Sequence, residues 1–100
     1  MKVLSSLTLA CGLMTASFAY AAVDADAAQA LMKKSACMSC HAVDKAKVGP
    51  AFNAMAKKYA GKADAEATLV KQLTANPAHK QIDSKDSAEI KNVVQWILAQ

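Results

Sequence analysis

The stretch that decides the fold is Cys37-Met38-Ser39-Cys40-His41, in the first half of a 100-residue chain. On a helical turn, side chains three or four positions apart share a face, so both thiols of this stretch point the same way. An imidazole follows the second thiol directly. Such a stretch can bind one cofactor in two ways: the thiols can bond to it covalently, and the imidazole can bind its metal.

The spacing Cys-x-x-Cys-His is the attachment pattern of c-type haem. Cys37 and Cys40 would form thioether bonds to the two vinyl groups of one porphyrin. His41 would then place its imidazole under the iron as the proximal ligand. We therefore predict one covalently attached haem c, with its iron, as the cofactor.

Three other uses of these residues compete with haem. A redox dithiol of the thioredoxin kind requires a βαβ pattern, which this sequence lacks. A plain disulfide between Cys37 and Cys40 leaves His41 without a role. Zinc could be held by the same three residues together with His79, but an adjacent Cys-His pair is not a usual zinc spacing.

Residues 1–21 have the three parts of a secretory signal peptide. A basic start precedes an uncharged apolar stretch over residues 3–18, and Ala19-Tyr20-Ala21 fits the small-x-small cleavage pattern. The apolar stretch is shorter than the roughly 20 residues that a membrane-spanning helix needs. We expect cleavage after Ala21, a periplasmic location, no stable membrane insertion, and one monohaem domain over residues 22–100.

Cys11 is the third cysteine and lies inside this segment. A lipoprotein signal prefers a leucine three positions before its cysteine, and Thr8 stands there instead. We expect Cys11 to be a small apolar residue that is lost with the signal. The mature chain then holds only Cys37 and Cys40.

The composition predicts a thin core. Hydrophobic residues make up 54% of the chain, but 23 of them are alanine. Beyond Ala and Cys, residues 22–100 contain nineteen sizeable apolar residues, which are few for a free-standing bundle. A covalent haem would supply the missing apolar body. Because the net charge is only +4, Arg is absent and aromatic residues are sparse, we do not expect nucleic-acid binding.

The spacing of apolar residues predicts an all-α fold. Four helices are expected, from Asp26 to about Ala36, from Pro50 to the turn at Gly61, from about Asp64 to Ala75, and from Ser84 or Asp86 towards the C-terminus. Asp26 and Gln29 resemble a capping box, and Pro50 suits the first position of a helix. No segment alternates with a period of two, so no sheet is expected.

From Leu31 onward the chain resembles a class I cytochrome c, especially the short bacterial cytochrome c-551/c-552 group. The resemblance rests on the segments Leu31–Asp44, Val48–Phe52, Lys58–Gly61 and Val94–Leu98. It implies a small cytochrome c-like helical bundle wrapped around one covalent haem, with the first and last helices crossing. It also implies that the Pro50 carbonyl accepts a hydrogen bond from the proximal imidazole and orients it.

The sequence departs from that family at the sixth iron ligand. Class I cytochromes usually supply a methionine from a loop before the last helix, but no methionine follows Met55, which we expect to be a core residue. The corresponding loop instead holds His79, the only histidine besides His41. We therefore expect bis-histidine ligation. Lys80 is a weaker candidate, because its ammonium must first lose a proton.

The resemblance and the paired histidines imply an electron-transfer protein rather than an enzyme. Two strong axial ligands leave no position for a substrate, and an imidazole in place of a thioether favours ferric iron. The lysines between Lys33 and Lys62 would attract redox partner proteins with acidic docking surfaces. Two alternatives stay open: a gas-binding or sensor protein with an open sixth site, and a small haem subunit of a redox enzyme complex.

Overall fold

The computed structural model describes Gly12 and residues 22–100. Within these residues the chain forms α1 (Ala25–Lys34), a 3₁₀ turn η1 (Cys37–Ser39), α2 (Phe52–Tyr59), α3 (Ala65–Ala75) and α4 (Ser87–Leu98). The described part contains no strand, and its backbone pairing outside helices and turns includes one isolated bridge between His41 and Ala46. The predicted all-α fold is confirmed. Apart from Gly12, the predicted signal peptide over residues 1–21 lies outside the described residues.

Helix α1 begins earlier and ends earlier than predicted. The capping prediction at Asp26 is wrong: Asp24 is the N-cap, and its carboxylate accepts a hydrogen bond from the Ala27 N–H at 3.0 Å. Asp26 lies in the first turn, where its negative charge interacts favourably with the positive end of the helix dipole. The helix ends at Lys34 because Ala36 adopts a left-handed conformation, with φ of 58°.

Helix α2 begins at Phe52, two residues after the predicted start at Pro50. Ala51 is its extended N-cap, with φ of −64° and ψ of 146°. Gly61 follows the end of α2 with φ of 73°, the conformation expected of a glycine that terminates a helix. The predicted stop at Gly61 is therefore confirmed.

The predictions for the last two helices agree with the structure. Helix α3 begins at Ala65, one residue after the predicted start. Asp86 is the N-cap of α4, and its carboxylate accepts hydrogen bonds from the N–H groups of Ala88 at 2.9 Å and Glu89 at 3.3 Å. Satisfying these otherwise unpaired donors stabilises the start of the helix.

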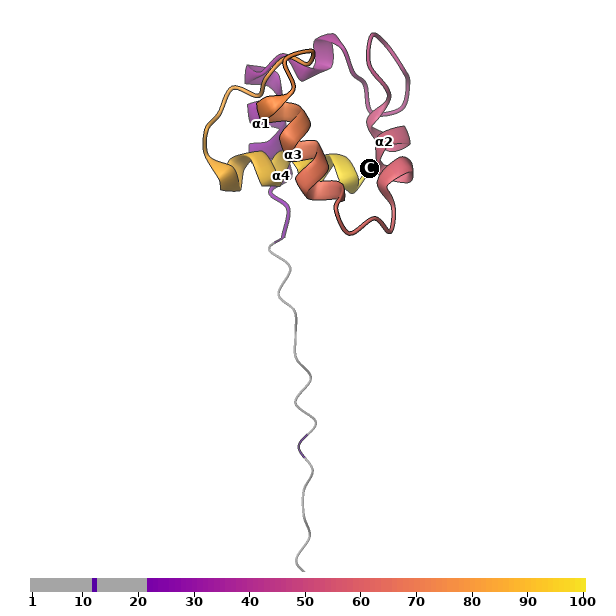
Figure 1. Cartoon of the computed structure of the whole chain (residues 1–100), viewed down its shortest axis with the longest axis vertical. Helices are drawn as coiled ribbons and strands as arrows, with labels where there is room; N and C mark the ends of the chain where they lie inside the picture. The colour runs from indigo at the N-terminus through magenta and orange to yellow at the C-terminus, as the bar shows by residue number, and fades with distance from the viewer. Residues whose placement is uncertain (1–11, 13–21) are drawn as a thin grey trace, which may run out of the picture.

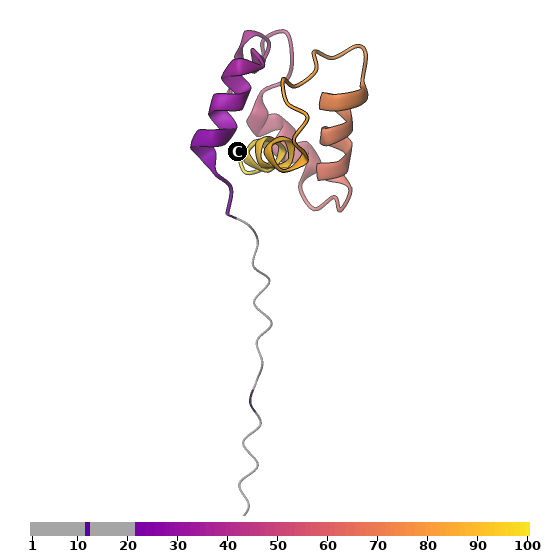
Figure 2. The same cartoon turned by 90° about the vertical axis from the view of Figure 1, so that its left-hand side faces the viewer.

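Helix α4 is the element against which the other three helices pack. It runs across the lower part of the domain and ends beside α2 (Figure 1), and Figure 2 shows it end-on between α1 and α3. Its buried residues recur every three or four positions, as on one face of a helix: Ile90, Val93, Val94 and Ile97. The contact between the first and last helices that the resemblance implied is present.

The beginning of α1 is also tied to α4 by a reciprocal pair of hydrogen bonds. The Asp24 N–H donates to Asn92 Oδ1 at 2.9 Å, and Asn92 Nδ2 donates to the Asp24 carbonyl at 2.9 Å. The two residues are 68 positions apart in the sequence. Asp24 therefore caps α1 with its side chain and anchors it to α4 with its backbone.

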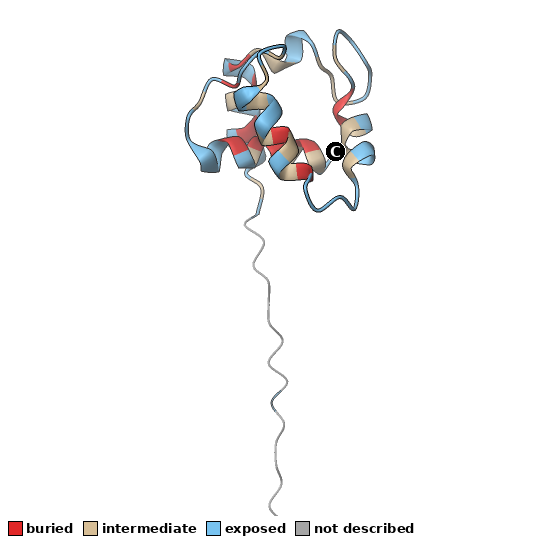
Figure 3. Cartoon of the chain, in the orientation of Figure 1, coloured by how far each residue is buried: buried red, intermediate tan, exposed pale blue. Residues whose placement is uncertain are grey.

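Buried side chains gather along α4 and the surfaces that face it (Figure 3). The main core cluster consists of Ala28, Met32, Phe52, Ile82, Ile90, Val93 and Ile97. Helices α2 and α3 each pack on α4, but in the described part of the chain they make little or no direct contact with each other. None of the helices described is long and apolar enough to cross a membrane.

Candidate haem-binding site

The two cysteines lie on the 3₁₀ turn that follows α1. The left-handed Ala36 turns the chain out of the helix. The N–H groups of Cys40 and His41 both donate to the Cys37 carbonyl, at 3.2 and 3.1 Å. Cys37, Cys40 and His41 line the same cavity, so the turn brings together the residues that the sequence motif singled out.

Both cysteines are free thiols in the structure, Cys37 half-buried and Cys40 exposed. Burial raises the pKa of the Cys37 thiol, although a backbone hydrogen bond and the nearby Lys80 charge act in the opposite direction. The protonated thiol is therefore favoured at neutral pH. Thioether formation with a vinyl group would use both atoms of the S–H bond, sulfur bonding to one carbon and hydrogen to the other.

The His41 ring is fixed by contacts on several sides. Its Nδ1 donates to the Pro50 carbonyl at 2.7 Å. The ring stacks on Phe52, with centroids 5.2 Å apart and planes at 22°. Gly49 lies against the ring so closely that a Cβ at this position would be 2.8 Å from Nδ1 and 2.9 Å from Nε2. Since a carbonyl can only accept, Nδ1 carries the proton and Nε2 keeps a lone pair for a metal.

Backbone hydrogen bonds hold the segment around His41. The Gly49 N–H donates to the Cys40 carbonyl at 2.7 Å, and the Phe52 N–H donates to the Ala42 carbonyl at 2.9 Å. These bonds bring the start of α2 against the attachment turn. The glycine and Phe52 that flank the imidazole are therefore positioned by the same segment that carries it.

His79, on the segment between α3 and α4, lies beside His41, and the two rings are stacked. The ring centroids are 6.1 Å apart and the planes are at 28°. His79 Nδ1 donates to the Lys80 carbonyl at 2.7 Å, which again leaves Nε2 with its lone pair. Histidines that bind metals usually donate their second N–H to a carbonyl or carboxylate, and both rings have this arrangement.

The spacing of the two rings fits one metal atom between them. Imidazole nitrogens lie about 2 Å from a first-row metal such as zinc, so rings on opposite sides of one atom have centres about 6 Å apart. The measured separation of His41 and His79 is 6.1 Å. In the described residues, no group of three or more His, Cys, Asp or Glu side chains is placed to hold a metal ion.

The loop that carries His79 begins with an Asn-based turn. The Ala78 N–H donates to Asn76 Oδ1 at 3.0 Å, and the His79 N–H donates to the Asn76 carbonyl at 3.1 Å. Asparagine side chains commonly stabilise such turns by bonding to the backbone two residues later. Asn76 therefore sets the backbone direction at His79.

The part of this loop that follows His79 in the sequence is bonded to the rest of the fold. The Ile82 N–H donates to the Leu73 carbonyl at 3.0 Å, and Ile82 is buried in the core. The next N–H, of Asp83, donates to Ser35 Oγ at 2.9 Å. Ser35 is 3% exposed and lies just after α1, so it links the His79 loop to the attachment turn. Sequence reasoning did not single out Ser35, because its partner lies 48 positions away.

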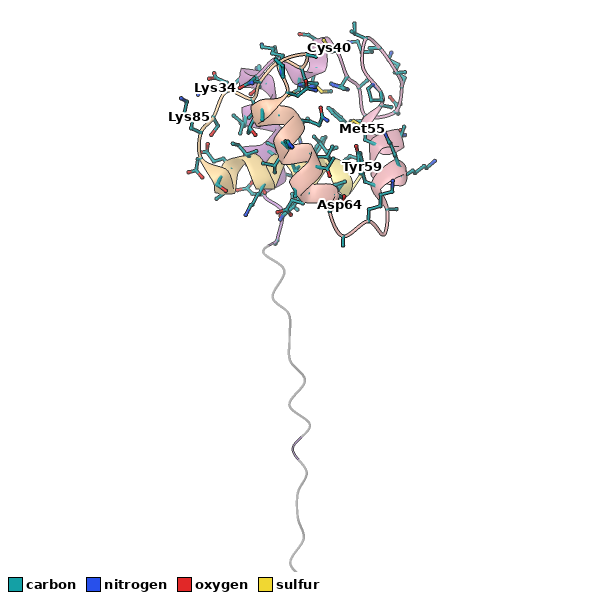
Figure 4. The ribbon with its side chains drawn as sticks, in the orientation of Figure 1. Lys34, Cys40, Met55, Tyr59, Asp64 and Lys85 are labelled. Atoms are coloured by element: carbon teal, nitrogen blue, oxygen red, sulfur yellow. The ribbon has the colours of Figure 1, made fainter. Side chains whose placement is uncertain are left out.

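Two cavities meet at the pair of histidines, with volumes of about 310 and 300 Å³. They share the lining residues His41, Pro50, Met55, Leu73, His79 and Ile97. The first extends to Cys37 and Cys40, and the second extends between α2 and α3. Figure 4 shows Cys40 above and Tyr59 below, with Met55 between them. Met55, expected to be core, lines both cavities. The cysteines at one end and the facing imidazoles in the middle fit a covalently held haem.

Comparison with known families identifies the domain. The family model Cytochrome c matches residues 25–100. The chain belongs to the cytochrome c family. Its cofactor is accordingly one covalently attached haem c with its iron, and the redox-dithiol and disulfide alternatives are set aside.

The cytochrome is similar to the short bacterial group, as predicted. It is 32% identical over 78 residues to cytochrome c-551 of Pseudomonas aeruginosa, covering 72% of this chain and 75% of that protein. It is 38% identical over 77 residues to cytochrome c-552 of Hydrogenobacter thermophilus, covering 69% of this chain and 76% of that protein.

Solved structures show the same fold. The class 1 cytochrome MtoD from Sideroxydans lithotrophicus ES-1 aligns with a TM-score of 0.72 and 45% identity, covering 78% of this chain and 97% of that one. Cytochrome c552 of Nitrosomonas europaea aligns with a TM-score of 0.58 and 33% identity, covering 71% and 96%. The predicted cytochrome c-like bundle is therefore confirmed.

Proposed function

We propose that this chain is an exported monohaem cytochrome that transfers single electrons between redox proteins, with His41 and His79 as the two axial ligands of the iron. Cys37 and Cys40 anchor the haem through thioethers, and Pro50 orients the proximal imidazole. The observation that carries this proposal is the matched pair of imidazoles. Each has Nδ1 bonded to a backbone carbonyl at 2.7 Å, and the ring centres are 6.1 Å apart.

The bound haem supplies a one-electron ferric/ferrous couple. The carbonyls of Pro50 and Lys80 increase the basicity of the two imidazoles by accepting their Nδ1 protons. More basic ligands favour the ferric state, so the reduction potential should lie below that of a His/Met cytochrome. Apolar side chains around the histidine pair, such as Leu73 and Ile97, exclude water from the electron-transfer centre.

Two axial imidazoles leave no position for a substrate at the iron. The cytochrome is therefore proposed to be an electron carrier and not an enzyme. The open-site alternative, a gas-binding or sensor protein, requires His79 to stay away from the iron. The enzyme-subunit alternative requires a stable partner that co-purifies with the chain.

Redox partners are proposed to dock at the edge of the domain that carries the cysteines. Val48 is 86% exposed and lines the cavity beside Cys40. Met38 is 45% exposed, and its carbonyl accepts a hydrogen bond from Lys47 Nζ at 3.0 Å. Exposed apolar residues next to lysines suit a short-lived contact with an acidic surface. Electron-transfer rates with such partners should fall as ionic strength rises.

Export is proposed from residues 1–21, which precede the described domain. The mature protein should begin at Ala22 and be recovered from the periplasm. Mass spectrometry of the purified cytochrome tests this directly. A mass that includes Cys11 would overturn the proposed cleavage.

The ligand assignment is tested by the absorption spectrum of the purified protein. Wild type should be low-spin in both oxidation states and should not bind carbon monoxide at once. His79→Ala should give a high-spin ferric spectrum and a ferrous form that binds carbon monoxide rapidly. Lys80→Ala is the matched control, because it removes the neighbouring candidate ligand and should stay low-spin.

His79→Met provides a second test at the same position. A thioether in place of the imidazole should stay low-spin and raise the reduction potential, since thioether ligands favour ferrous iron. An unchanged spectrum and potential in both His79 variants would show that His79 is not a ligand. A wild-type protein that binds carbon monoxide at once would support the open-site alternative instead.

A further inference from the structure

A groove of about 630 Å³ lies where α1, the attachment turn and the end of α4 meet. This α1–α4 groove is distinct from the two cavities at the histidine pair, because it shares only Ala36 with either of them. Its lining includes one lysine and several larger apolar side chains: Lys33, Met32, Met38, Val43 and Trp96. No acidic side chain of the described residues lines it, so the charge that the groove presents is positive.

A series of aromatic rings leads from the α1–α4 groove to the proximal imidazole. Trp96 is half-buried in the groove wall and meets Phe52 edge to face, with ring centroids 5.8 Å apart and planes at 80°. Phe52 in turn stacks on the His41 ring at 5.2 Å. Aromatic pairs in contact have centroids about 4.5–7 Å apart, so the three rings form an unbroken series. Their delocalised electrons extend orbital overlap from the iron ligand to the wall of the groove.

The groove also offers unpaired polar groups to a partner. The Trp96 indole N–H donates to no acceptor among the described residues, and every buried side-chain nitrogen or oxygen there has a partner, so solvent reaches this N–H. Lys33 is exposed and makes no ion pair with the described residues, whereas its neighbour Lys34 lies 3.8 Å from the Asp83 carboxylate. Methionine and aromatic residues are enriched where proteins bind one another. A protein surface that presents carboxylates around an apolar side chain would match this groove.

We propose that the α1–α4 groove is a second docking surface, for an acidic redox protein that exchanges electrons with the iron through Trp96, Phe52 and His41. This inference rests on the proposed function, with haem attached at Cys37 and Cys40. When ferric iron is reduced by this route, the partner loses one electron and the iron gains it. No bond forms or breaks in the cytochrome, no proton is transferred to it, and neither Trp96 nor Phe52 is oxidised on the way.

The α1–α4 groove and the edge that carries the cysteines are adjoining surfaces with different residues. Met38 lies where they join, since it lines the groove and follows Cys37 directly. Val48 lines the cavity beside Cys40 but not the groove, and Ala30 lines the groove but neither cavity at the histidine pair. A charge introduced at Ala30 or at Val48 therefore tests one surface at a time.

Docking in the groove is followed through Trp96, the one tryptophan of the chain. In a nitrogen-15 NMR spectrum of the haem-loaded protein, its indole N–H gives a single resonance. The probe is oxidised flavodoxin, a small acidic flavoprotein. At low ionic strength it should shift this resonance, and added salt should reverse the shift because the charges are then screened.

The charge of the groove is tested by Ala30→Glu, with Ala67→Glu as the matched control. Both alanines are exposed on helices and both substitutions change the net charge equally, but Ala67 belongs to α3, on the other side of α4 (Figure 2). Ala30→Glu should raise the flavodoxin concentration that half-saturates the shift by about threefold, in keeping with one exposed charge interaction. Ala67→Glu should change it much less. Lys33→Gln and Lys71→Gln form a second pair on the same two helices, with the same expected order.

The aromatic route is tested by the rate of electron transfer from reduced flavodoxin at saturation, where docking no longer limits it. Trp96→Leu interrupts the series of rings, whereas Trp96→Phe keeps it, and both variants lose the indole N–H. With Val48→Glu added to weaken docking at the cysteine edge, the leucine variant should be several-fold slower than the phenylalanine variant. A potentiometric titration checks that their reduction potentials are equal.

The outcomes separate this inference from the proposed function. Equal half-saturation for Ala30→Glu and Ala67→Glu, or equal limiting rates for the two Trp96 variants, would overturn the inference. If Trp96→Leu does not retain haem, the comparison of Ala30→Glu with Ala67→Glu decides alone. If the variants carry covalent low-spin haem and Val48→Glu slows electron transfer, the proposed function stands whatever the groove does. A wild-type protein without covalent haem would remove the basis of both.

Discussion

The two histidines of the site are held by the same kind of hydrogen bond but by very different surroundings. His41 stacks on Phe52, lies against Gly49 and donates to a carbonyl nine residues away in the sequence. His79 donates to the carbonyl of its own neighbour, Lys80, in a loop between α3 and α4. Both imidazoles are half-buried, but the first is held by contacts from several segments, whereas the second is carried by a short loop with a few anchors.

With the proposed ligation, this difference predicts which side of the iron determines attachment and which side is adjustable. The proximal side would combine the covalent anchors with the imidazole in one continuous segment. The distal side would depend on a loop that is linked to the fold by the buried Ile82 side chain and by a few hydrogen bonds, such as that from the Asp83 N–H to Ser35. Substitutions near His41 should therefore destabilise the fold, whereas substitutions near His79 should change the sixth ligand of the iron.

The largest effect is expected when the two cysteines are removed, because without an attached haem neither histidine has an iron to bind. In the double variant Cys37→Ala/Cys40→Ala no haem is attached, and we expect the domain to be largely unfolded. Without the haem, the apolar side chains that line the cavity lose their main packing partner. The nineteen sizeable apolar residues of positions 22–100 are then few for a stable core. Circular dichroism and thermal melting measure this loss.

Cys11→Ala is the matched control for the anchors, because it removes a thiol from the proposed signal peptide. Haem content, detected by haem staining after denaturing electrophoresis, should equal that of wild type. A cooperative thermal transition in the haem-free double variant would contradict this account of the fold.

The next largest effect is expected at Gly49, where the packing on the proximal imidazole is tightest. Gly49→Ala places a Cβ against the His41 ring, so the ring or the backbone must move. Overpacking of this kind costs about 1–3 kcal/mol, and we expect a lower melting temperature and a smaller yield of attached haem. Gly61→Ala serves as the comparison: nothing lies within 4 Å of its Cβ, and only the φ of 73° opposes the substitution. Gly61→Ala should therefore give a normal yield of attached haem, and an equally normal yield in Gly49→Ala would show that ring contact does not matter there.

Ser35→Ala is expected to loosen the distal side alone. It leaves the Asp83 N–H without its partner in a partly buried position, at a cost of about 1–3 kcal/mol. If about half of that cost, roughly 1 kcal/mol, is borne by the His79 loop, added imidazole or cyanide should bind ferric iron about fivefold faster, since 1.4 kcal/mol is a factor of ten.

Ser39→Ala is the control for this variant, because Ser39 is an exposed serine on the attachment turn. It should leave the binding rate of cyanide unchanged. Equal rates for wild type and Ser35→Ala would show that the distal loop does not depend on this hydrogen bond.

The smallest effect is expected at Ala36, where the substitution should stabilise the protein instead of destabilising it. Ala36 has φ of 58°, where L-residues other than glycine are disfavoured by about 1–2 kcal/mol. Ala36→Gly should therefore raise the melting temperature of the holoprotein slightly, the gain being reduced by the greater freedom of glycine in the unfolded chain. Ala30→Gly, at an exposed position within α1, should lower the melting temperature, because glycine costs about 1 kcal/mol in a helix. Thermal melts of both variants establish the signs.

The sequence was informative wherever the determinants are close together along the chain. The attachment motif spans five residues, and the cap at Asp86 depends on the two N–H groups that follow it. Gly61 is a local signal as well. Such features depend on short-range geometry that the order of residues largely fixes.

Long-range contacts decided the features that the sequence did not reveal. Asp24 and Asp26 are both suitable N-caps for α1, and Asn92, at the other end of the chain, bonds to the backbone of Asp24. The link from Ser35 to Asp83 also depends on how the helices pack. His79 was identifiable only because it is the one other histidine, and its distance from His41 required the fold.

The position of α4 at the end of the chain has a consequence for assembly. Each of the other helices packs on α4, so none of them can complete its burial until the last twelve helical residues have been synthesised and released. Until then the segment with Cys37 and Cys40 has no closed core around it. The order of the elements along the polypeptide therefore leaves the two thiols accessible until the C-terminal helix is in place.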